Sequence, residues 1–412
     1  MKVLITNHTL STRTGTETYV RDLALGLLAK GHSPIVYSPQ GGAIADELRN
    51  LTIPVVDDLA RIATHVDLIH GHHRHETMTA LLHFPGVPAI FFVHDWHSWH
   101  DLPPAFPRIL RYVAIDGTRR DRLLLENGIP ESMVTLLPNG VDTQRFRPRA
   151  PLPTQPKRGL VFSNYVRSFD QIRELRDACM QSGMSLDVVG AGMQRSVTQP
   201  EQMLCGYDLV FAMGRSALEA MAVGAGVIVW GLEGMGEFVR PDNFERLQDS
   251  NFGRRALRHA SAAELAAEIR RFDREAARAI QERVRNTLAQ SHLVERHLQL
   301  YEEVIRESTV RRWQPDEELR MAANYMKSCL PAMQQETQHK MMAQRRRRQR
   351  LRLIDITWIC LSLFVVAFGV RVEMLAFNAE SYGLSIGGLA VSLMLCFGLF
   401  TLRRHLRGEL IA

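Results

Sequence analysis

The sequence predicts an α/β protein with two parallel-sheet domains, followed by a pair of apolar helices that cross a membrane. Short apolar runs alternate with helix-length stretches along most of the chain, which is typical of strand–helix–strand units with parallel strands. A proline-rich stretch interrupts the alternation, which then resumes and so indicates a second domain. Long uncharged segments near the C-terminus indicate the membrane helices.

Composition and charge agree with a folded, partly membrane-bound chain. Its 412 residues are 46% hydrophobic and 23% charged, which suffices for two domains with real cores and excludes a disordered protein. Much of the net charge of +6 comes from one block, Arg345–Arg348 with Arg350 and Arg352. This block has no interleaved aromatic residues and directly precedes an apolar run. It therefore favours a cytoplasmic membrane flank over a nucleic-acid-binding arm.

The cysteines and the N-terminus both favour a cytosolic location for the globular part. The cysteines are scattered without C-x-x-C spacing, which favours neither a disulfide framework nor a thiolate metal site. Met1 leads directly into an apolar strand pattern, without the pattern of a cleaved signal peptide. We therefore expect the globular part on the cytoplasmic face of the inner (plasma) membrane. The cysteines are Cys179, Cys205, Cys329, Cys360 and Cys396.

Residues 353–402 are expected to form two transmembrane helices. Ser381–Leu402 contains no formal charge and is long enough to cross a hydrocarbon core of about 30 Å as a helix. Ile354–Leu375 reaches the same length with charges only near its ends. Arginines flank the pair on both outer sides, whereas the connecting segment 371–383 carries more acidic than basic residues. Both outer ends, including the tail 403–412, should therefore be cytosolic.

The first domain is expected to span residues 1–148. Its first strand is followed by a loop rich in Thr and Ser, and then by a helical pattern from Tyr19 to Leu28 that ends at Gly31. Thr118–Glu126 is another helix-sized stretch between strands. The expected strands are Lys2–Ile5, Ser33–Tyr37, Asp67–His70, Val87–Val93, Tyr112–Ile115 and Val134–Leu136.

The second domain is expected to span residues 158–307, after the linker 149–157. Prolines are concentrated around the linker, and the chain becomes helical from about Ser261 to Arg306. Residues 308–352 then form a helical, arginine-rich juxtamembrane segment. The expected strands are Gly159–Phe162, Leu186–Val189, Leu209–Phe211 and Val227–Trp230.

Candidate site residues follow two strands of the first domain, because parallel sheets bind ligands beyond the carboxyl ends of their strands. Gly15 lies in a Thr-rich loop that opens a helix and is suited to a phosphate or a close-approaching substrate. Taken alone, this loop fits an ordinary helix start equally well. His94 and Asp95 follow the strand that ends at Val93. A histidine here can bond a substrate hydroxyl or accept its proton, although a loop histidine without a function has the same pattern.

The richest candidate stretch is Gly214–Gly224, which follows a strand and opens a helix. Free amides at the helix start, at Gly214 and Ser216, attract a diphosphate, and Arg215 adds positive charge. Glu219 can accept hydrogen bonds from ribose hydroxyls. Its alternative role is that of an acid that stabilises the positive end of the helix dipole.

A metal site is not expected. His70, His72, His73 and His75 are close together in sequence, but no acidic or cysteine ligand pattern completes them.

Taken together, these segments resemble the retaining glycosyltransferases of the GT-B fold, the family 4-like group that includes lipopolysaccharide and mannosyl transferases. The resemblance covers about residues 1–307. It depends on the order of the N-terminal "MKVLITNHTLSTRTGTETYV", then "IFFVHDW", "LLPNGVDTQRFRP" and "SALEAMAVGAGVIV". It implies two Rossmann-like domains that face each other across a cleft, the first on the acceptor side and the second binding the nucleotide-sugar.

The resemblance also implies roles for single residues. Gly15 would line the diphosphate and acceptor cleft, His94 would touch the transferred sugar, and Glu219 would bind the ribose. It implies transfer from a nucleotide-sugar to a lipid-linked or glycan acceptor in envelope, exopolysaccharide or lipopolysaccharide biosynthesis. The family mostly works without a metal cofactor, so backbone amides and cationic side chains would stabilise the leaving diphosphate.

Three departures from the family pattern leave two other functions open. Phe211 occupies the position where the family usually has a second glutamate, eight positions before Glu219. The usual Arg and Lys are absent from Ser163–Ser168, so that Arg167, Arg173 or Arg215 would have to replace them. The stretch between Gly192 and Asp208 also looks one strand–helix unit short. The alternatives are a catalytically degenerate membrane scaffold of a glycan-assembly complex and a nucleotide-sugar epimerase on the same fold.

Overall fold

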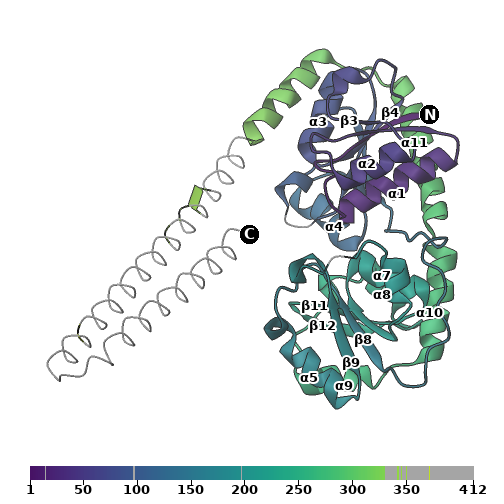
Figure 1. Cartoon of the computed structure of the whole chain (residues 1–412). Coiled ribbons are helices and arrows are strands. Elements are labelled where there is room, and N and C mark those ends of the chain that lie inside the picture. The colour runs from purple at the N-terminus through teal and green to yellow at the C-terminus, as the bar shows by residue number, and fades with distance from the viewer. Residues whose placement is uncertain are drawn as a thin grey trace, which may run out of the picture. The chain divides into compact units, whose positions relative to one another are not determined.

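The computed structural model describes residues 1–13, 15–95, 98–195 and 197–329, with the single residues Met341, Met342, Arg345, Gln349 and Arg371. The chain divides into two compact units, Met1–Ala323 and Asn324–Ala412, and both sheets lie in the first (Figure 1). Apart from Arg371, the two expected membrane helices lie outside the described residues. Within the described residues, no helix is both long enough and apolar enough to cross a membrane.

The N-terminal sheet has seven strands in the order β3-β2-β1-β4-β5-β6-β7, and each pairing is parallel. The chain first adds strands on one side of β1 and then continues on the other side with β4. The loops after β1 and β4 therefore diverge, which opens a crevice at the carboxyl edge of the sheet. The strands are β1 Lys2–Thr6, β2 Ser33–Tyr37, β3 Val55–Val56, β4 Leu68–His72, β5 Ala89–Val93, β6 Ile109–Ala114 and β7 Val134–Leu136.

Helices connect these strands and bury apolar faces on the sheet. In α1, Gly15–Ala29, the buried Val20, Leu23 and Leu27 recur every three or four residues and so form one apolar stripe. The helix predicted over Thr118–Glu126 forms as α4, Gly117–Asp121, and continues as a π-helical turn, Arg122–Glu126. The other helices of this domain are α2 Ala43–Asn50 and α3 Arg74–His83.

The C-terminal sheet has five strands in the order β12-β11-β10-β8-β9. All pairings are parallel except that of β12, which is antiparallel to β11. The two largely parallel sheets confirm the predicted α/β class. The strands are β8 Arg158–Phe162, β9 Ser185–Val189, β10 Leu209–Ala212, β11 Gly226–Gly231 and β12 Gly234–Phe238, and the helices are α5 Arg173–Gln181, α6 Pro200–Leu204, α7 Gly214–Val223, α8 Phe244–Asp249, α9 Ala262–Ile269 and α10 Arg274–Thr287.

The connection between β9 and β10 is short, as the sequence suggested. Apart from Ser196, which is not described, it contains a 3₁₀ turn, Ala191–Met193, and the five-residue helix α6. No strand forms among its described residues. The sheet therefore passes directly from β9 to the other side of β8, where β10 pairs.

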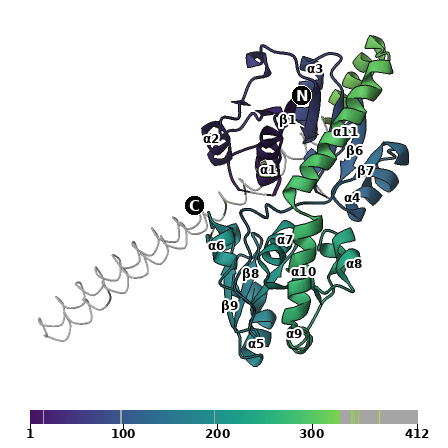
Figure 2. The same cartoon turned by 90° about the vertical axis from the view of Figure 1, so that its right-hand side faces the viewer.

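The last helix of the first unit, α11 Gln290–Val310, returns to the N-terminal domain (Figure 2). Its buried Val294, Leu300, Tyr301 and Val304 lie in the core cluster that contains β1, β4 and α1. The approach to α1 is close, since a Cβ on Gly26 would lie 2.4 Å from a methyl carbon of Val294. The sequence pattern alone groups this helix with the second domain, because its apolar spacing does not reveal which sheet it covers.

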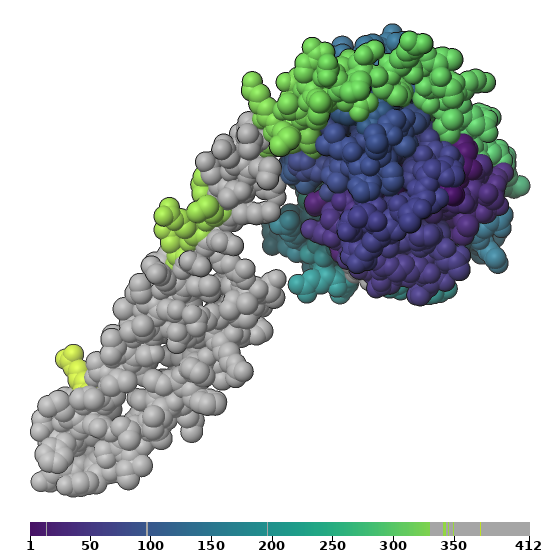
Figure 3. All heavy atoms as spheres, turned by 90° about the horizontal axis from the view of Figure 1, so that it is seen from above, coloured from purple at the N-terminus to yellow at the C-terminus, as the bar shows by residue number. Residues whose placement is uncertain are grey.

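Glu318, which follows α11 within the first unit, contacts the N-terminal domain. Figure 3 shows green residues that follow α10 lying over the blue elements of that domain. The fully buried Arg108 donates from Nε to Glu318 Oε1 at 2.9 Å and from Nη1 to the carbonyl oxygens of Phe84 and Val87, both at 2.8 Å. This guanidinium therefore ties the helix that begins near residue 315 to α3 and β5.

Candidate functional site

A cavity of about 480 Å³ lies between the carboxyl ends of the two sheets. The loop after β1 contributes Arg13 and Gly15, and α7 contributes Arg215, Ser216 and Glu219. We call it the Glu219 cavity. The loops after β8 and β9 complete its wall with Ser163, Asn164, Gly190 and Ala191. It therefore brings together four of the predicted site residues, Gly15, Arg215, Ser216 and Glu219.

The start of α7 is shaped by its short connection to β10. β10 ends at Ala212, Met213 is extended, and Gly214 opens the helix with φ +57°, a conformation that glycine adopts readily. The Gly214 amide donates to the carbonyl oxygen of Phe252 at 3.3 Å. The amides of Arg215 and Ser216 follow at the positive end of the helix dipole, where anions are favoured.

Glu219 is held by Arg215 within the same helix. Its Oε1 accepts a hydrogen bond from Arg215 Nε at 3.0 Å, and both side chains are largely buried. Burial raises the pKa of the Glu219 carboxyl, while the Arg215 guanidinium opposes that rise. The Arg215 pKa is itself raised by Asp22 and Glu219, so this guanidinium keeps its charge.

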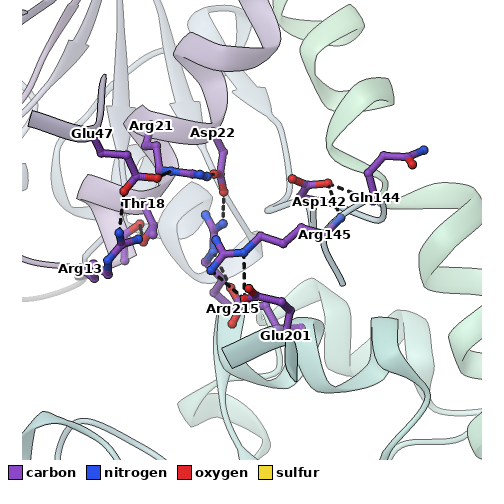
Figure 4. Close-up of polar contacts among 12 residues, drawn as sticks. Arg13, Thr18, Arg21, Asp22, Glu47, Asp142, Gln144, Arg145, Glu201 and Arg215 are labelled. Atoms are coloured by element: carbon purple, nitrogen blue, oxygen red, sulfur yellow. Dashed lines mark hydrogen bonds and ion pairs between the residues drawn. The ribbon is translucent and has the colours of Figure 1, made fainter. Parts of the chain in front are cut away.

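The Arg215 guanidinium also donates to Asp22 of α1, which joins the two domains. Figure 4 shows how this contact continues through a chain of ion pairs. Arg21 bonds Asp22 and Glu47, both at 2.6 Å, and Arg13 bonds the other oxygen of Glu47 at 2.6 Å. Positive and negative side chains therefore alternate along one side of the Glu219 cavity, and each is paired with a neighbour of opposite charge.

A third cavity arginine, Arg145, comes from the segment that connects the domains. Its Nε donates to Glu201 Oε2 at 2.9 Å, and its backbone amide donates to Asp142 Oδ1 at 3.0 Å (Figure 4). Arg13 and Arg145 are not among the site residues predicted from the sequence. Both lie inside the motifs quoted above, but only the fold brings them to the same cavity.

His94 lies at the end of β5, as predicted, and its amide, carbonyl oxygen and Nε2 are hydrogen-bonded. Its Nε2 is hydrogen-bonded to Nδ1 of His72 at 2.8 Å. Its amide donates to Asp101 Oδ2 at 3.1 Å, and its carbonyl accepts from Arg119 Nε at 3.1 Å. Burial lowers the pKa of His94 from 6.5 to about 3, with further lowering by His73 and Arg119. His94 is thus neutral at pH 7, and it does not line either of the two interdomain cavities described here.

The fold places the histidines that are close together in sequence in different surroundings, although the rings of His70 and His72 lie 4.6 Å apart. His70 and His72 are fully buried, and His70 Nδ1 bonds the Tyr301 hydroxyl at 2.5 Å. His73 precedes α3, and the ring of His75 lies 5.0 Å from that of Trp99. No group of three or more His, Cys, Asp or Glu side chains in the described part of the chain is arranged to hold a metal ion.

A second interdomain cavity, of about 520 Å³, also reaches the start of α7 and shares no lining residue with the first. We call it the Arg254 cavity. Gly214 lines it, whereas the next two residues line the Glu219 cavity. The N-terminal domain contributes Asp95, Thr118 and Arg119, and the C-terminal domain contributes Asn251, Arg254 and Arg255 among others.

The structure locates the departures seen in the sequence. Phe211 is fully buried inside β10 and packs in the core, so this position points into the domain and not into the cleft. Neither Arg167 nor Arg173 is among the residues that line the Glu219 cavity. The Asn164 side chain instead accepts from the Ala191 amide at 2.9 Å and joins the loops after β8 and β9.

Comparison with known proteins assigns the N-terminal domain. Residues 13–145 match the family model described as Glycosyltransferase Family 4. The N-terminal domain is thus similar to glycosyltransferase family 4 over most of its length. Gly15 and His94 lie inside the matched segment, whereas Arg215 and Glu219 lie beyond it. No curated protein matches the chain.

Solved structures extend the similarity to both domains. A glycosyltransferase from Rickettsia africae is 16% identical, covers 74% of this chain and 98% of its own, and superposes with a TM-score of 0.52. HepE of Anabaena, solved in complex with UDP and glucose, is 15% identical and covers 74% of this chain and 100% of its own, with a TM-score of 0.50. The chain thus has the GT-B fold, and the family domain and fold together support a transferase enzyme.

Proposed function

We propose that the protein is a retaining glycosyltransferase that moves a sugar from a nucleotide-sugar to a lipid-linked or glycan acceptor in envelope, exopolysaccharide or lipopolysaccharide biosynthesis. The observation that carries this proposal is the Glu219 cavity. It is lined from both domains, contains the start of α7, and exposes Arg13, Arg145 and Arg215 to a bound anion.

In this proposal the nucleoside diphosphate occupies the Glu219 cavity. The Glu219 carboxylate accepts hydrogen bonds from ribose hydroxyls, and the glycine-containing wall at Gly15 and Gly190 lets a ligand approach the backbone closely. The diphosphate lies at the start of α7, where the amides of Arg215 and Ser216 and the helix dipole favour negative charge. HepE, which has the same fold, was solved with UDP and glucose.

During transfer, the bond between the anomeric carbon and the diphosphate oxygen breaks, and a bond from the acceptor hydroxyl oxygen to that carbon forms. The leaving diphosphate takes the bonding electron pair, and the acceptor proton passes to a phosphate oxygen. Backbone amides and the guanidinium groups stabilise the developing charge in place of a metal. In this proposal the transferred sugar reaches His94, which is the neighbour of the cavity-lining Asp95. The His94 ring, neutral because burial lowers its pKa to about 3, then exchanges a hydrogen bond with a sugar hydroxyl without adding charge.

We also propose that the enzyme works at the cytoplasmic face of the inner membrane. The arginine block and the uncharged segments within 353–402 support this location. A site held at the bilayer meets a soluble donor and a membrane-borne acceptor together.

The test is binding of a panel of UDP-, GDP-, ADP- and dTDP-sugars to the full chain in detergent, measured by calorimetry. Glu219→Ala is compared with Glu282→Ala, because Glu282 also pairs with an arginine four residues earlier but on the exposed face of α10. We expect Glu219→Ala to weaken binding at least tenfold and Glu282→Ala to leave it unchanged.

The outcomes separate the competing functions. If no nucleotide-sugar binds, the transferase proposal fails and the degenerate scaffold replaces it. If a donor binds and is converted to an epimeric sugar without an acceptor, the epimerase is correct. Analysis of the product's anomeric configuration by NMR tests retention.

A further inference from the structure

The Arg254 cavity lies next to the proposed reaction centre. Asp95 follows β5 directly after His94, and Thr118 and Arg119 follow β6. On the opposite side lie Gly214, the first residue of α7, and the loop after α8. A diphosphate bound at the start of α7 would therefore have the nucleotide on one side, in the Glu219 cavity, and the transferred group on the other.

The lining of this cavity is positively charged. Arg119, Arg254 and Arg255 line it, against one lining carboxylate, that of Asp95. Arg119 is fixed by two contacts, a bond of Nη1 to Asp116 Oδ2 at 2.8 Å and the bond of Nε to the His94 carbonyl. The Arg119 side chain is therefore a fixed part of the cavity wall next to His94, the catalytic candidate.

Among the described residues, the other two arginines make exposed ion pairs. Arg254 pairs with Glu233 at 3.0 Å with side chains 62% and 48% exposed, and Arg255 pairs with Asp121 at 2.6 Å with side chains 45% and 38% exposed. Such solvent-screened pairs are weak. A guanidinium has five N–H donors in a fork that matches carboxylate and phosphate oxygens, so each arginine can exchange its partner for a bound anion.

The loop that carries these arginines has an unusual backbone. Asn251 and Phe252 both have positive φ, 53° and 50°, a conformation that non-glycine residues rarely adopt. Burial of the Phe252 side chain and a bond from its amide to the Leu247 carbonyl at 2.7 Å hold the loop. The Asn251 side chain accepts from Asn139 Nδ2 at 3.3 Å, which ties the loop to the segment that connects the domains. Strained conformations of this kind gather at ligand sites.

We propose that the Arg254 cavity binds an anionic group of a substrate, a carboxylate or a phosphate, held by Arg254 and Arg255 next to the bond that is formed. The inference rests on the proposed function and deepens it, because it names the class of substrate. The anion has two possible sources: a uronic acid as the transferred sugar, or a phosphate on the acceptor.

The experiment compares the full-length wild type with the double variant Arg254→Gln/Arg255→Gln. The matched control is Arg278→Gln, which removes an arginine from a similarly exposed pair with Glu282 on α10, away from both cavities. Calorimetry measures binding of inorganic phosphate, first alone and then with saturating UDP or GDP. A second series compares UDP-glucuronate with UDP-glucose, and GDP-mannuronate with GDP-mannose.

The expected result is at least tenfold weaker anion binding in the double variant and no change in the control. If the wild type prefers the uronate donor and the double variant loses that preference, the anion is the carboxylate of the transferred sugar. If the donors bind equally and phosphate binds in the presence of the nucleotide, the anion is a phosphate of the acceptor. Each result supports the proposal, and melting curves confirm that the variants are folded.

The proposal is overturned if the wild type binds neither probe preferentially, or if the double variant binds them as the wild type does. Failure of the proposed function gives a different pattern, in which no nucleotide binds and Glu219→Ala has no effect. The difference in phosphate binding between the wild type and the double variant tests the Arg254 cavity in either case, because Arg254 and Arg255 line that cavity and not the Glu219 cavity.

Discussion

Arg215 of α7 donates hydrogen bonds to both Glu219 of its own helix and Asp22 of α1. One guanidinium therefore links the proposed ribose-binding carboxylate to the opposite domain. Because Asp22 and Glu219 share its charge, the attraction of the cavity for a diphosphate is weaker than its arginine content suggests. Nucleotide binding must compete with this pre-existing pairing.

Replacement of Asp22 by alanine should tighten nucleotide binding while it lowers stability. The variant removes a negative charge next to the anion site and releases part of the Arg215 guanidinium, so we expect UDP or GDP to bind several-fold more tightly. The lost charged hydrogen bond between largely buried groups should cost about 1–3 kcal/mol of unfolding free energy. Calorimetry and chemical unfolding measure both effects. Asp46→Ala, which removes an exposed ion pair of α2, is the control. Unchanged or weaker nucleotide binding by Asp22→Ala would show that Asp22 does not compete with the nucleotide for Arg215.

Gly15→Ala should weaken binding of the donor without destabilising the fold. A Cβ at Gly15 meets no atom within 4 Å, and the residue opens a helix, so the free energy of unfolding should change by less than about 1 kcal/mol. The added methyl group enters the Glu219 cavity and should weaken binding of the donor. Gly41→Ala, whose Cβ makes an ordinary 3.7 Å contact with Ala45, is the control. Equal donor affinity of Gly15→Ala and wild type would show that no ligand approaches this backbone.

His94 should act as a neutral group across the physiological pH range. Because its pKa is lowered to about 3, the pH profile of kcat/KM should contain no transition near 6.5 that disappears in His94 variants. We expect His94→Ala to lower kcat at least tenfold, and His94→Gln, which retains hydrogen bonding, to lower it less. His65→Ala, with a side chain 72% exposed, is the control. A transition near 6.5 that is present in wild type and absent in His94→Gln would disprove the neutral role.

Acidification should destabilise the N-terminal domain. Burial lowers the pKa of His73 and His94 to about 3 and that of His297 to about 4, so the unfolded chain binds protons that these folded side chains do not. Their stabilising contribution is complete above pH 6.5 and is lost as the pH falls toward 4. The pKa of Asp101 is raised to about 7, so this folded side chain binds a proton between pH 7 and 4 that the unfolded chain does not. Asp101 therefore stabilises the fold on acidification and cancels the effect of about one histidine.

Chemical unfolding of the full chain between pH 7.5 and 4.5 measures this effect. Each buried histidine contributes a slope of up to about 1.4 kcal/mol per pH unit. The variant His297→Gln removes one titrating group and should reduce the slope. His65→Gln, which changes a side chain that is 72% exposed, is the control. A free energy of unfolding that is independent of pH in this range would show that the histidines titrate normally in the folded protein.

Most strands were predictable because their signals are local. Ser33–Tyr37 and Val134–Leu136 coincide with β2 and β7, and the other predicted strands differ from the observed ones by a few residues at their ends. The cavity residues of α7 were also predictable from local sequence. A strand followed directly by a helix that begins with glycine presents free amides in any sequence context. The two-residue β3 and the antiparallel β12 were missed, because neither has a distinctive apolar run.

The long-range contacts of the site could not be predicted. Asp22 and Arg215 are hydrogen-bonded although they are 193 residues apart in the sequence. From the sequence alone, Asp22 has the pattern of a solvent-exposed acid on a helix. The bond between His94 and His72 requires the register of β4 beside β5, which places the two strand ends together. Phe211 was interpreted as a replaced glutamate, although the short β10–α7 connection places it inside the sheet. Such relations depend on how the sheets pair and not on any one segment.

The return of α11 to the first domain bears on how the chain is made. The core beneath α1 is complete only when Val294, Leu300, Tyr301 and Val304 are in place. During synthesis the seven strands of the N-terminal sheet leave the ribosome long before these residues do. One apolar surface of the N-terminal half therefore stays uncovered until the entire second domain has been translated. A nascent chain that stops at residue 148 should consequently attract chaperones, and a protein truncated before α11 should aggregate even though every strand of its first sheet is present.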